Sequence, residues 1–220
     1  MAAALFSALG VWQVERRAWK HDLIARVDAR IHAPAVPAPG PEAWPQISPE
    51  TSEYLRVTTR GRFVPEKATL VQAVTALGPG FWFVVPFETE RGFTVLVNRG
   101  YVPGAWKDPA ARTPDDTAGE ATVSGLLRLT EPGGGFLRTN DPAGDRWFSR
   151  DVAAIAAARG LTPVAPYFID ADAALPSGRY PAGGLTVVSF PDSHLVYALT
   201  WFAMALLSAG AAVWLWRRRT

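Results

Sequence analysis

The side chains of this chain that could bind a metal are few, because the sequence contains three histidines and no cysteine. Without thiolates the chain can form no disulfide framework and no cysteine-based zinc or iron–sulfur site. His21 and His32 lie near a proline-rich stretch and are expected at the surface, whereas His194 begins a long apolar segment. Ionisable residues in membrane segments are candidates for function, although a histidine at a helix start is often a plain interfacial residue. Of the three, His194 is best placed to reach a metal.

The helical face that continues from His194 combines aromatic and small side chains. At helical spacing, Tyr197, Ala198, Trp201 and Ala205 share this face. Such a face could hold a flat ligand, or it could pack against a second membrane helix, since small residues allow close approach. Both uses are compatible if the ligand lies in the groove between two helices.

The two residues before His194 could orient its ring. A metal-bound imidazole usually donates its second ring nitrogen to an oxygen acceptor. Asp192 or Ser193 could supply that acceptor. Ser193 could instead cap the helix that begins at His194.

Three cations follow a short apolar segment at the N-terminus. Arg16, Arg17 and Lys20 would lie on the same side of the membrane as His194 if both apolar segments span it. Arginine is well suited to bidentate contacts with carboxylates, but the same residues could equally face lipid phosphates. The sequence thus predicts a cationic rim beside His194 and leaves its ligand open.

Known catalytic motifs are missing from the sequence, which contains no G-x-S-x-G, H-E-x-x-H, P-loop or G-x-G-x-x-G pattern. Gly133-Gly134-Gly135 is not followed by Lys and Ser or Thr, so it is predicted to be a loop and not a phosphate site. The formal net charge of +2 is too small to indicate a basic surface of the kind that binds nucleic acid. We therefore expect a protein that is not an enzyme and does not bind nucleic acid.

The apolar segment after His194 is long enough to cross a membrane. Residues 195–216 contain no charge and would span about 33 Å as a helix, against a hydrocarbon core of about 30 Å. The arginines that follow predict a cytoplasmic tail and place the preceding chain outside. Residues 1–14 are apolar but too short to span; a re-entrant segment or the end of a soluble helix would also fit. We expect a first membrane helix whose first turns are missing.

The region between the apolar segments is predicted to be a β-rich external domain. Six prolines between Ala33 and Pro49 exclude a helix there and predict an extended connector. Gly92 closes a three-residue connection typical of a hairpin. The 19 glycines and 19 prolines fit short strands joined by turns, as in an antiparallel barrel or sandwich. The expected strands are Tyr54–Val64, Thr69–Val74, Phe81–Thr89, Phe93–Val97, Thr122–Leu129, Tyr167–Asp170 and Leu185–Phe190.

One helix is predicted inside this domain. Ser149 can cap it, Asp151 suits its first turn, and Gly160 ends it. The chain is thus predicted to be an α+β membrane protein, in which two transmembrane helices flank an antiparallel barrel- or sandwich-like domain. The predicted parts are 1–14 (first membrane helix), 15–52 (juxtamembrane segment and Pro-rich linker), 53–193 (β-rich domain), 194–216 (second membrane helix) and 217–220 (cytoplasmic tail).

Several segments, taken in order, resemble the Surfeit locus protein 1 family of cytochrome c oxidase assembly proteins. Leu9–Lys20 is similar to the end of the family's first membrane helix, and His194–Phe202 to the opening of its second. The resemblance departs at the short first span and at Asp192-Ser193, where an Asn or Glu is expected next to the histidine. The segments between the two helices that carry it are Val97–Pro103, Gly125–Glu131, Asn140–Pro142, Trp147, Arg150–Asp151, Phe168–Asp170 and Gly183–Val187.

The resemblance implies a membrane-anchored assembly factor for haem-copper cytochrome c oxidase. It implies that the protein binds haem a and supports its insertion into subunit I, with His194 as an axial ligand of the haem iron. Tyr197 and Trp201 would then face the macrocycle, while Arg16 and Arg17 would meet its propionates. Its partners would be subunit I, haem a synthase or other assembly factors, and membrane lipid, in a bacterial inner membrane with the main domain periplasmic. The alternative is a scaffold that binds oxidase subunits without binding haem.

Overall fold

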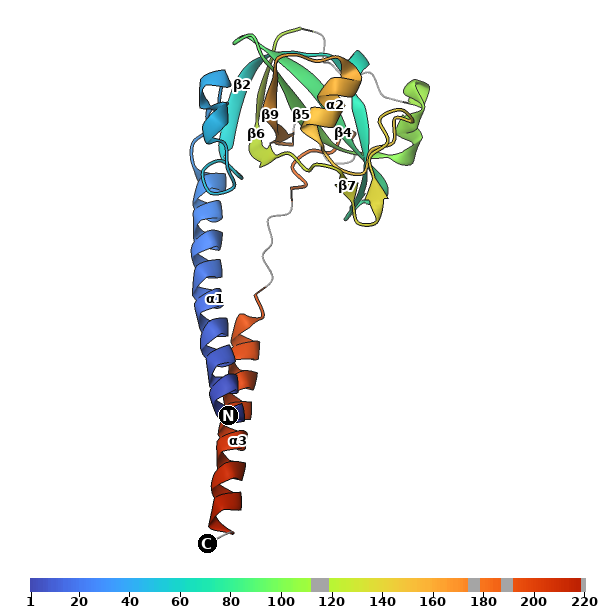
Figure 1. The fold of residues 1–220 in the computed structure, drawn as a ribbon. Helices are drawn as coiled ribbons and strands as arrows, with labels where there is room; N and C mark the ends of the chain where they lie inside the picture. The colour runs from blue at the N-terminus through green and yellow to red at the C-terminus, as the bar shows by residue number, and fades with distance from the viewer. Residues whose placement is uncertain (112–118, 174–178, 187–191, 219–220) are drawn as a thin grey trace. The chain divides into compact units, whose positions relative to one another are not determined.

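The computed structural model describes residues 1–111, 119–173, 179–186 and 192–218 (Figure 1). The chain divides into two compact units. The helical unit contains residues 1–29 and the C-terminal helix, and the barrel unit contains residues 30–187. The helical unit therefore holds both apolar segments, and the barrel unit holds the predicted strands.

Two long helices make up the helical unit. α1 covers Ala2–His32 and α3 covers His194–Arg217. α1 continues past residue 14, where we expected the apolar segment to end, because residues 15–32 contain neither proline nor glycine. Within the described part of the chain, α3 is the one helix that is long and apolar enough to cross a membrane. The span predicted for residues 1–14 stays a prediction.

Five strands of the barrel unit close into a barrel. They pair in the order β2-β6-β9-β5-β4, and β4 pairs back onto β2. β4 can pair with β2, β3 and β5 because it is 12 residues long and its register shifts between Trp82 and Val84. β3 extends the sheet beyond β4, and β1 pairs in parallel with β2. The strands are β1 (Val36–Pro37), β2 (Arg56–Phe63), β3 (Thr69–Thr75), β4 (Gly78–Thr89), β5 (Thr94–Pro103), β6 (Ala121–Leu129) and β9 (Val164–Ala171).

The barrel is not purely antiparallel, which corrects the expectation from sequence. β9 runs antiparallel to β6 but parallel to β5. A closed ring with an odd number of strands cannot reverse direction at every pair, so at least one pair must be parallel. In this five-stranded ring the parallel pair falls between β5 and β9.

Six of the seven predicted strands are confirmed, with shifted ends. The hairpin between β4 and β5 is also confirmed, since Gly92 has a φ of 80°. The seventh strand, Leu185–Phe190, lies mostly outside the described residues, and its described part is not in a strand. Gly134–Gly135 forms the short strand β7, which pairs with β8 (Arg138–Thr139), so the predicted glycine loop is one arm of a hairpin.

The barrel core comes from apolar residues that alternate along the strands. Val95, Val97, Leu127 and Ile169 are fully buried in one cluster. A second cluster forms where α2 (Val152–Arg159) lies over the barrel strands (Figure 1).

The predicted cap of α2 is wrong by two residues. Asp151, and not Ser149, occupies the N-cap position, and its carboxylate accepts the N–H of Ala154 at 3.1 Å. The Ser149 hydroxyl instead donates to the Glu131 carbonyl at 2.6 Å. Gly160 ends the helix in the left-handed conformation, as predicted.

The proline-rich stretch is not a free linker, which corrects another expectation. It contributes β1 and a 3₁₀ helix, Pro41–Gln46, because proline is compatible with the first turn of such a helix. Trp44 packs edge-on against Phe93 with ring centroids 5.8 Å apart. The hydroxyl of Tyr167, a barrel residue, donates to the Pro39 carbonyl at 2.7 Å, and burial raises the pKa of this tyrosine. The stretch is therefore packed against the barrel.

Candidate functional site

His194 is the first residue of α3, and its ring is held by a residue of α1. Its Nδ1 donates to Oε1 of Gln13 at 2.7 Å. A neutral imidazole carries one proton, so a donating Nδ1 leaves Nε2 with an available lone pair. Nε2 of His194 makes no hydrogen bond to any described residue. This hydrogen bond is compatible with the tautomer that could bind a metal through Nε2.

Asp192 joins the two helices just outside the start of α3. Its Oδ2 accepts from Nε2 of His21 at 2.8 Å and lies 3.5 Å from Nε of Arg17. Its Oδ1 accepts the backbone N–H of His194 at 3.1 Å. The bond from His21, followed by that from the His194 backbone, holds the pKa of Asp192 below its usual value. The carboxylate therefore stays charged at neutral pH and anchors the first turn of α3.

The structure corrects the predicted support of the His194 ring. Neither Asp192 nor Ser193 accepts from the imidazole, and Ser193 makes no side-chain cap bond. Gln13 fills the acceptor role, and sequence reasoning missed it. It lies 181 residues from His194 in the chain, so no local spacing connects the two.

The face of α3 that continues from His194 packs closely against α1. Ala198 and Ala205 are buried at 2% and 7% exposure. Trp201 stacks on Phe6 with ring centroids 5.8 Å apart. A Cβ on Gly10 would lie 2.6 Å from the Phe202 ring, so only glycine permits this approach. Of the two uses predicted for this face, helix packing is the one these contacts serve.

The remaining predicted site residues lie at the edge of this packing. The side chain of Tyr197 is 55% exposed. The guanidinium of Arg16 lies over the Trp19 ring at 4.0 Å, whereas Arg17 turns toward Asp192. The structure therefore brings His194 and Arg17 together through Asp192, while Arg16 points to a different neighbour.

A second polar cluster, which sequence reasoning missed, lies in the barrel unit around Asp170. The carboxylate is only 4% exposed, and four side chains donate to it. They are Asn98 (2.7 Å), Arg128 (3.0 Å), Thr186 (3.0 Å) and Arg150 (3.1 Å).

The two arginines of this cluster each have a further carboxylate. Arg128 donates to Glu53 at 2.7 Å, and Arg150 donates to Glu131 at 2.5 Å. Burial disfavours the charge on Arg128, but Asp170 and Glu53 outweigh it and raise the pKa of this arginine. Burial likewise disfavours the charge on Glu131, but Arg150 outweighs it and lowers the pKa of that carboxyl. Every charge in the cluster therefore has an opposite partner.

A cavity of about 480 Å³ adjoins this cluster, with Trp82 and Leu185 among its walls. The residues of the cluster belong to segments that carried the family resemblance, namely those around Asn98, Arg128, Arg150, Asp170 and Thr186. Because the charged groups are paired with one another, the cluster ties the strand ends together, although Arg128, Arg150 and Asp170 also line the cavity. Convergence of the resembling segments was the signal in the sequence that could have found it.

No group of three or more His, Asp or Glu side chains converges among the described residues to hold a metal ion. A single imidazole cannot hold a free ion by itself, because protein metal sites need several ligands. It is sufficient when the metal brings its own ligands.

Comparison with known proteins gives consistent matches along the chain. The SURF1 family matches residues 1–206. Surfeit locus protein 1 of Rattus norvegicus is 34% identical over 227 residues, covering 96% of this chain and 71% of the rat protein. Surfeit locus protein 1 of Homo sapiens is 34% identical over 230 residues, covering 96% and 72%. The protein of the same name from Takifugu rubripes is 33% identical over 225 residues, covering 94% and 89%. The matched range contains α1, the barrel unit and the His194 end of α3.

Proposed function

This chain belongs to the SURF1 family, and we propose that it is a membrane-anchored assembly factor for haem-copper cytochrome c oxidase that binds haem a and supports its insertion into subunit I. The family is known for cytochrome c oxidase assembly factors. The single observation that carries the haem proposal is the orientation of His194 by Gln13, which leaves Nε2 available. Haem iron accepts a neutral imidazole as an axial ligand.

The donor set at the start of α3 fits a haem group. Four positions of haem iron are filled by the macrocycle, so one histidine from the protein is enough to begin binding. Haem supplies the metal and two propionates, and His194 would hold the iron while Arg17 would meet a carboxylate. Arg17 pairs with Asp192 through its Nε at 3.5 Å, and the other N–H groups of its guanidinium could donate to such an anion.

The aromatic contacts narrow the proposed binding surface. Trp201 is engaged by Phe6, so we expect Tyr197, which is exposed, to make the aromatic contact with the macrocycle. Arg16 can still offer its guanidinium edge while it stacks on Trp19. The haem would lie along the outer edge of the α1–α3 contact.

We also propose the membrane placement. Both helices would span a bacterial inner membrane, with the barrel unit in the periplasm, because the arginines after Trp216 favour the cytoplasmic side. Subunit I, haem a synthase or other assembly factors would then meet the chain at the periplasmic end of α3.

A second candidate is a scaffold that binds oxidase subunits without haem. The packing of Ala198, Trp201 and Ala205 against α1 favours it, because those contacts explain the face below His194 without any ligand. Under this proposal His194 would be a polar anchor between two helices.

Spectroscopy of the purified chain separates the two candidates. The full chain is co-expressed with haem a synthesis, purified, and its visible spectrum is compared among wild type, His194→Ala and the control His32→Ala. The haem proposal expects pigment in wild type and control and its loss in His194→Ala. Pigment that is equal in all three would remove His194 as the ligand. Capture of oxidase subunits by every variant, with pigment in none, would favour the scaffold.

A further inference from the structure

The tip of the β7–β8 hairpin holds two bulky apolar side chains in water. Gly135 pairs with Arg138, which leaves Phe136 and Leu137 as a two-residue loop. Phe136 is 91% exposed and Leu137 is 88% exposed. Leu137 also has a φ of 56°, a conformation that favours glycine or asparagine. Exposure and backbone strain both disfavour these residue types at the tip, so folding alone does not account for them.

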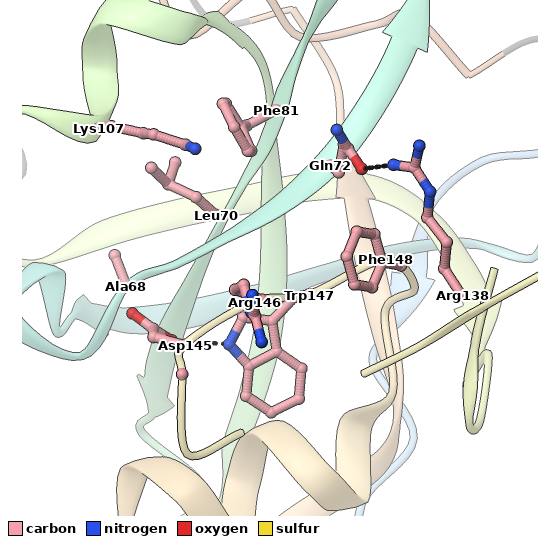
Figure 2. A pocket seen from close by; sticks show the side chains of 11 residues that line it. Ala68, Leu70, Gln72, Phe81, Lys107, Arg138, Asp145, Arg146, Trp147 and Phe148 are labelled. Carbon is pink, nitrogen blue, oxygen red and sulfur yellow. Dashed lines mark hydrogen bonds between the residues drawn. The ribbon is translucent and has the colours of Figure 1, made fainter. Parts of the chain in front are cut away.

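The hairpin is firmly held at its base. The N–H of Gly133 donates to the Asp151 carboxylate at 2.9 Å, and the N–H of Asn140 donates to the Gly133 carbonyl at 3.1 Å. Arg138 crosses to β3 and donates to Gln72 at 2.5 Å (Figure 2). The tip is therefore presented on a fixed support.

Positive charge borders the hairpin. Arg138 and Lys107 line a cavity of about 520 Å³ (Figure 2). Neither forms an ion pair with any described residue: Lys107 lies over the Phe81 ring at 5.1 Å, and Arg138 lies over the Phe148 ring at 5.4 Å. These two cations have capacity for an anion that no described residue of the barrel unit supplies.

We propose that this hairpin is a second membrane contact, in which Phe136 and Leu137 insert into the interface of an anionic bilayer and Arg138 and Lys107 meet lipid phosphates. Apolar side chains next to basic ones are typical of segments that lie in the membrane interface. The proposal rests on α3 lying in a membrane and does not depend on haem binding.

The size and the charge of this surface favour lipid over a protein as the occupant. The two tip side chains offer about 400 Å² of surface at most, about half of what each partner contributes to a stable protein interface. A small apolar wedge with basic neighbours suits a lipid surface better.

Because the chain contains no cysteine, a single introduced cysteine can be labelled with one fluorophore at one known position. The full chain with Phe136→Cys, labelled with an environment-sensitive fluorophore, is placed in lipid nanodiscs with or without anionic lipid. Glu90→Cys, at the exposed β4–β5 hairpin, is the control for the barrel surface. Leu206→Cys, 75% exposed on α3, is the control for the membrane span.

We expect the Phe136 probe to shift to shorter wavelength in anionic nanodiscs and to lose emission when spin-labelled lipids are added. The Glu90 probe should stay water-like, and the Leu206 probe should be quenched throughout. Adding Arg138→Gln and Lys107→Gln should weaken the Phe136 response, whereas Arg62→Gln, whose guanidinium pairs with Glu88, should not. A quenched Leu206 probe with a water-like Phe136 probe would overturn the proposal. So would a Phe136 response that requires an added oxidase subunit, since that identifies a protein partner.

Discussion

The two polar clusters of this chain use the same residue types in opposite ways. In the barrel unit, Asp170 is 4% exposed and accepts from four side chains. In the helical unit, Asp192 is 20% exposed and pairs with Arg17 at 3.5 Å. Next to it, Nε2 of His194 makes no hydrogen bond to any residue that the structure describes. The charged groups of the first cluster are all paired with one another, whereas the second cluster keeps a ring nitrogen without a hydrogen bond to any described residue.

This difference separates a structural role from a binding role. Buried charges are tolerated when each is paired, and removing one partner leaves the others uncompensated. A binding site needs the reverse, because its donors and lone pairs must remain available for a ligand. We therefore expect substitutions in the barrel cluster to change stability and those at α3 to change binding.

The largest expected effect is that of Asp170→Asn. It leaves Arg128 and Arg150 with one carboxylate each in a buried setting, which should lower the free energy of unfolding by about 3 kcal/mol. Chemical denaturation of the purified chain in detergent, followed by near-ultraviolet circular dichroism, measures this. Asp192→Asn is the matched control and should cost less than about 0.5 kcal/mol in the same transition. Equal losses in the two variants would erase the distinction between the clusters.

Gly10→Leu should act on the helical unit instead. Its side chain would meet the Phe202 ring, and overpacking of this kind costs about 1–3 kcal/mol. We expect α1 and α3 to separate, the bond between Gln13 and His194 to break, and haem uptake to fall, with the barrel transition unchanged. Gly210→Leu is the control, because nothing lies within 4 Å of that position. Normal haem uptake by Gly10→Leu would show that the α1 contact does not organise the site.

Asp151→Ala should have a smaller effect, confined to the barrel unit. It removes the cap of α2, which costs about 1 kcal/mol, and it also removes the bond to Gly133 at the hairpin base. The denaturation midpoint reports the loss, and Glu66→Ala at an exposed position serves as the control. A loss of stability as large as that of Asp170→Asn would mean that the buried cluster contributes no more to the free energy of unfolding than a helix cap does.

Acid should weaken the barrel unit partly through Glu131. Its pKa is lowered in the folded protein, so its contribution is present above the unfolded value near 4.5 and is lost as the pH falls through the lower folded value. Denaturation between pH 6 and pH 3 should show a shallower decline in Glu131→Gln than in wild type. Parallel declines in the two proteins would assign the acid sensitivity to other carboxyls.

The sequence was informative wherever the cause of structure is local. Alternating apolar residues predicted the strands, and Gly92 and Gly160 marked a hairpin and a helix end by their backbone freedom. The parallel pair β5–β9 was missed because it follows from closure of the ring, which no local pattern encodes. The proline-rich stretch was misjudged because its packing depends on Tyr167, far along the chain.

The candidate site shows the same limit. His194 was found because it is a rare residue at the start of a long apolar segment. Gln13 was missed because a neutral amide in an apolar helix carries no signal until the helices meet. Asp170 was missed because an aspartate at a strand end looks like an exposed residue until four donors converge on it.

The tautomer of His194 tests the central claim most directly. The chain is labelled with ¹⁵N-histidine and studied in detergent by NMR near neutral pH without haem, and the His194 signals are identified by their loss in His194→Ala. The account predicts a neutral ring protonated at Nδ1, with Nε2 unprotonated, and a shift of this population in Gln13→Leu. A ring protonated at Nε2, or one that does not respond to Gln13→Leu, would contradict it.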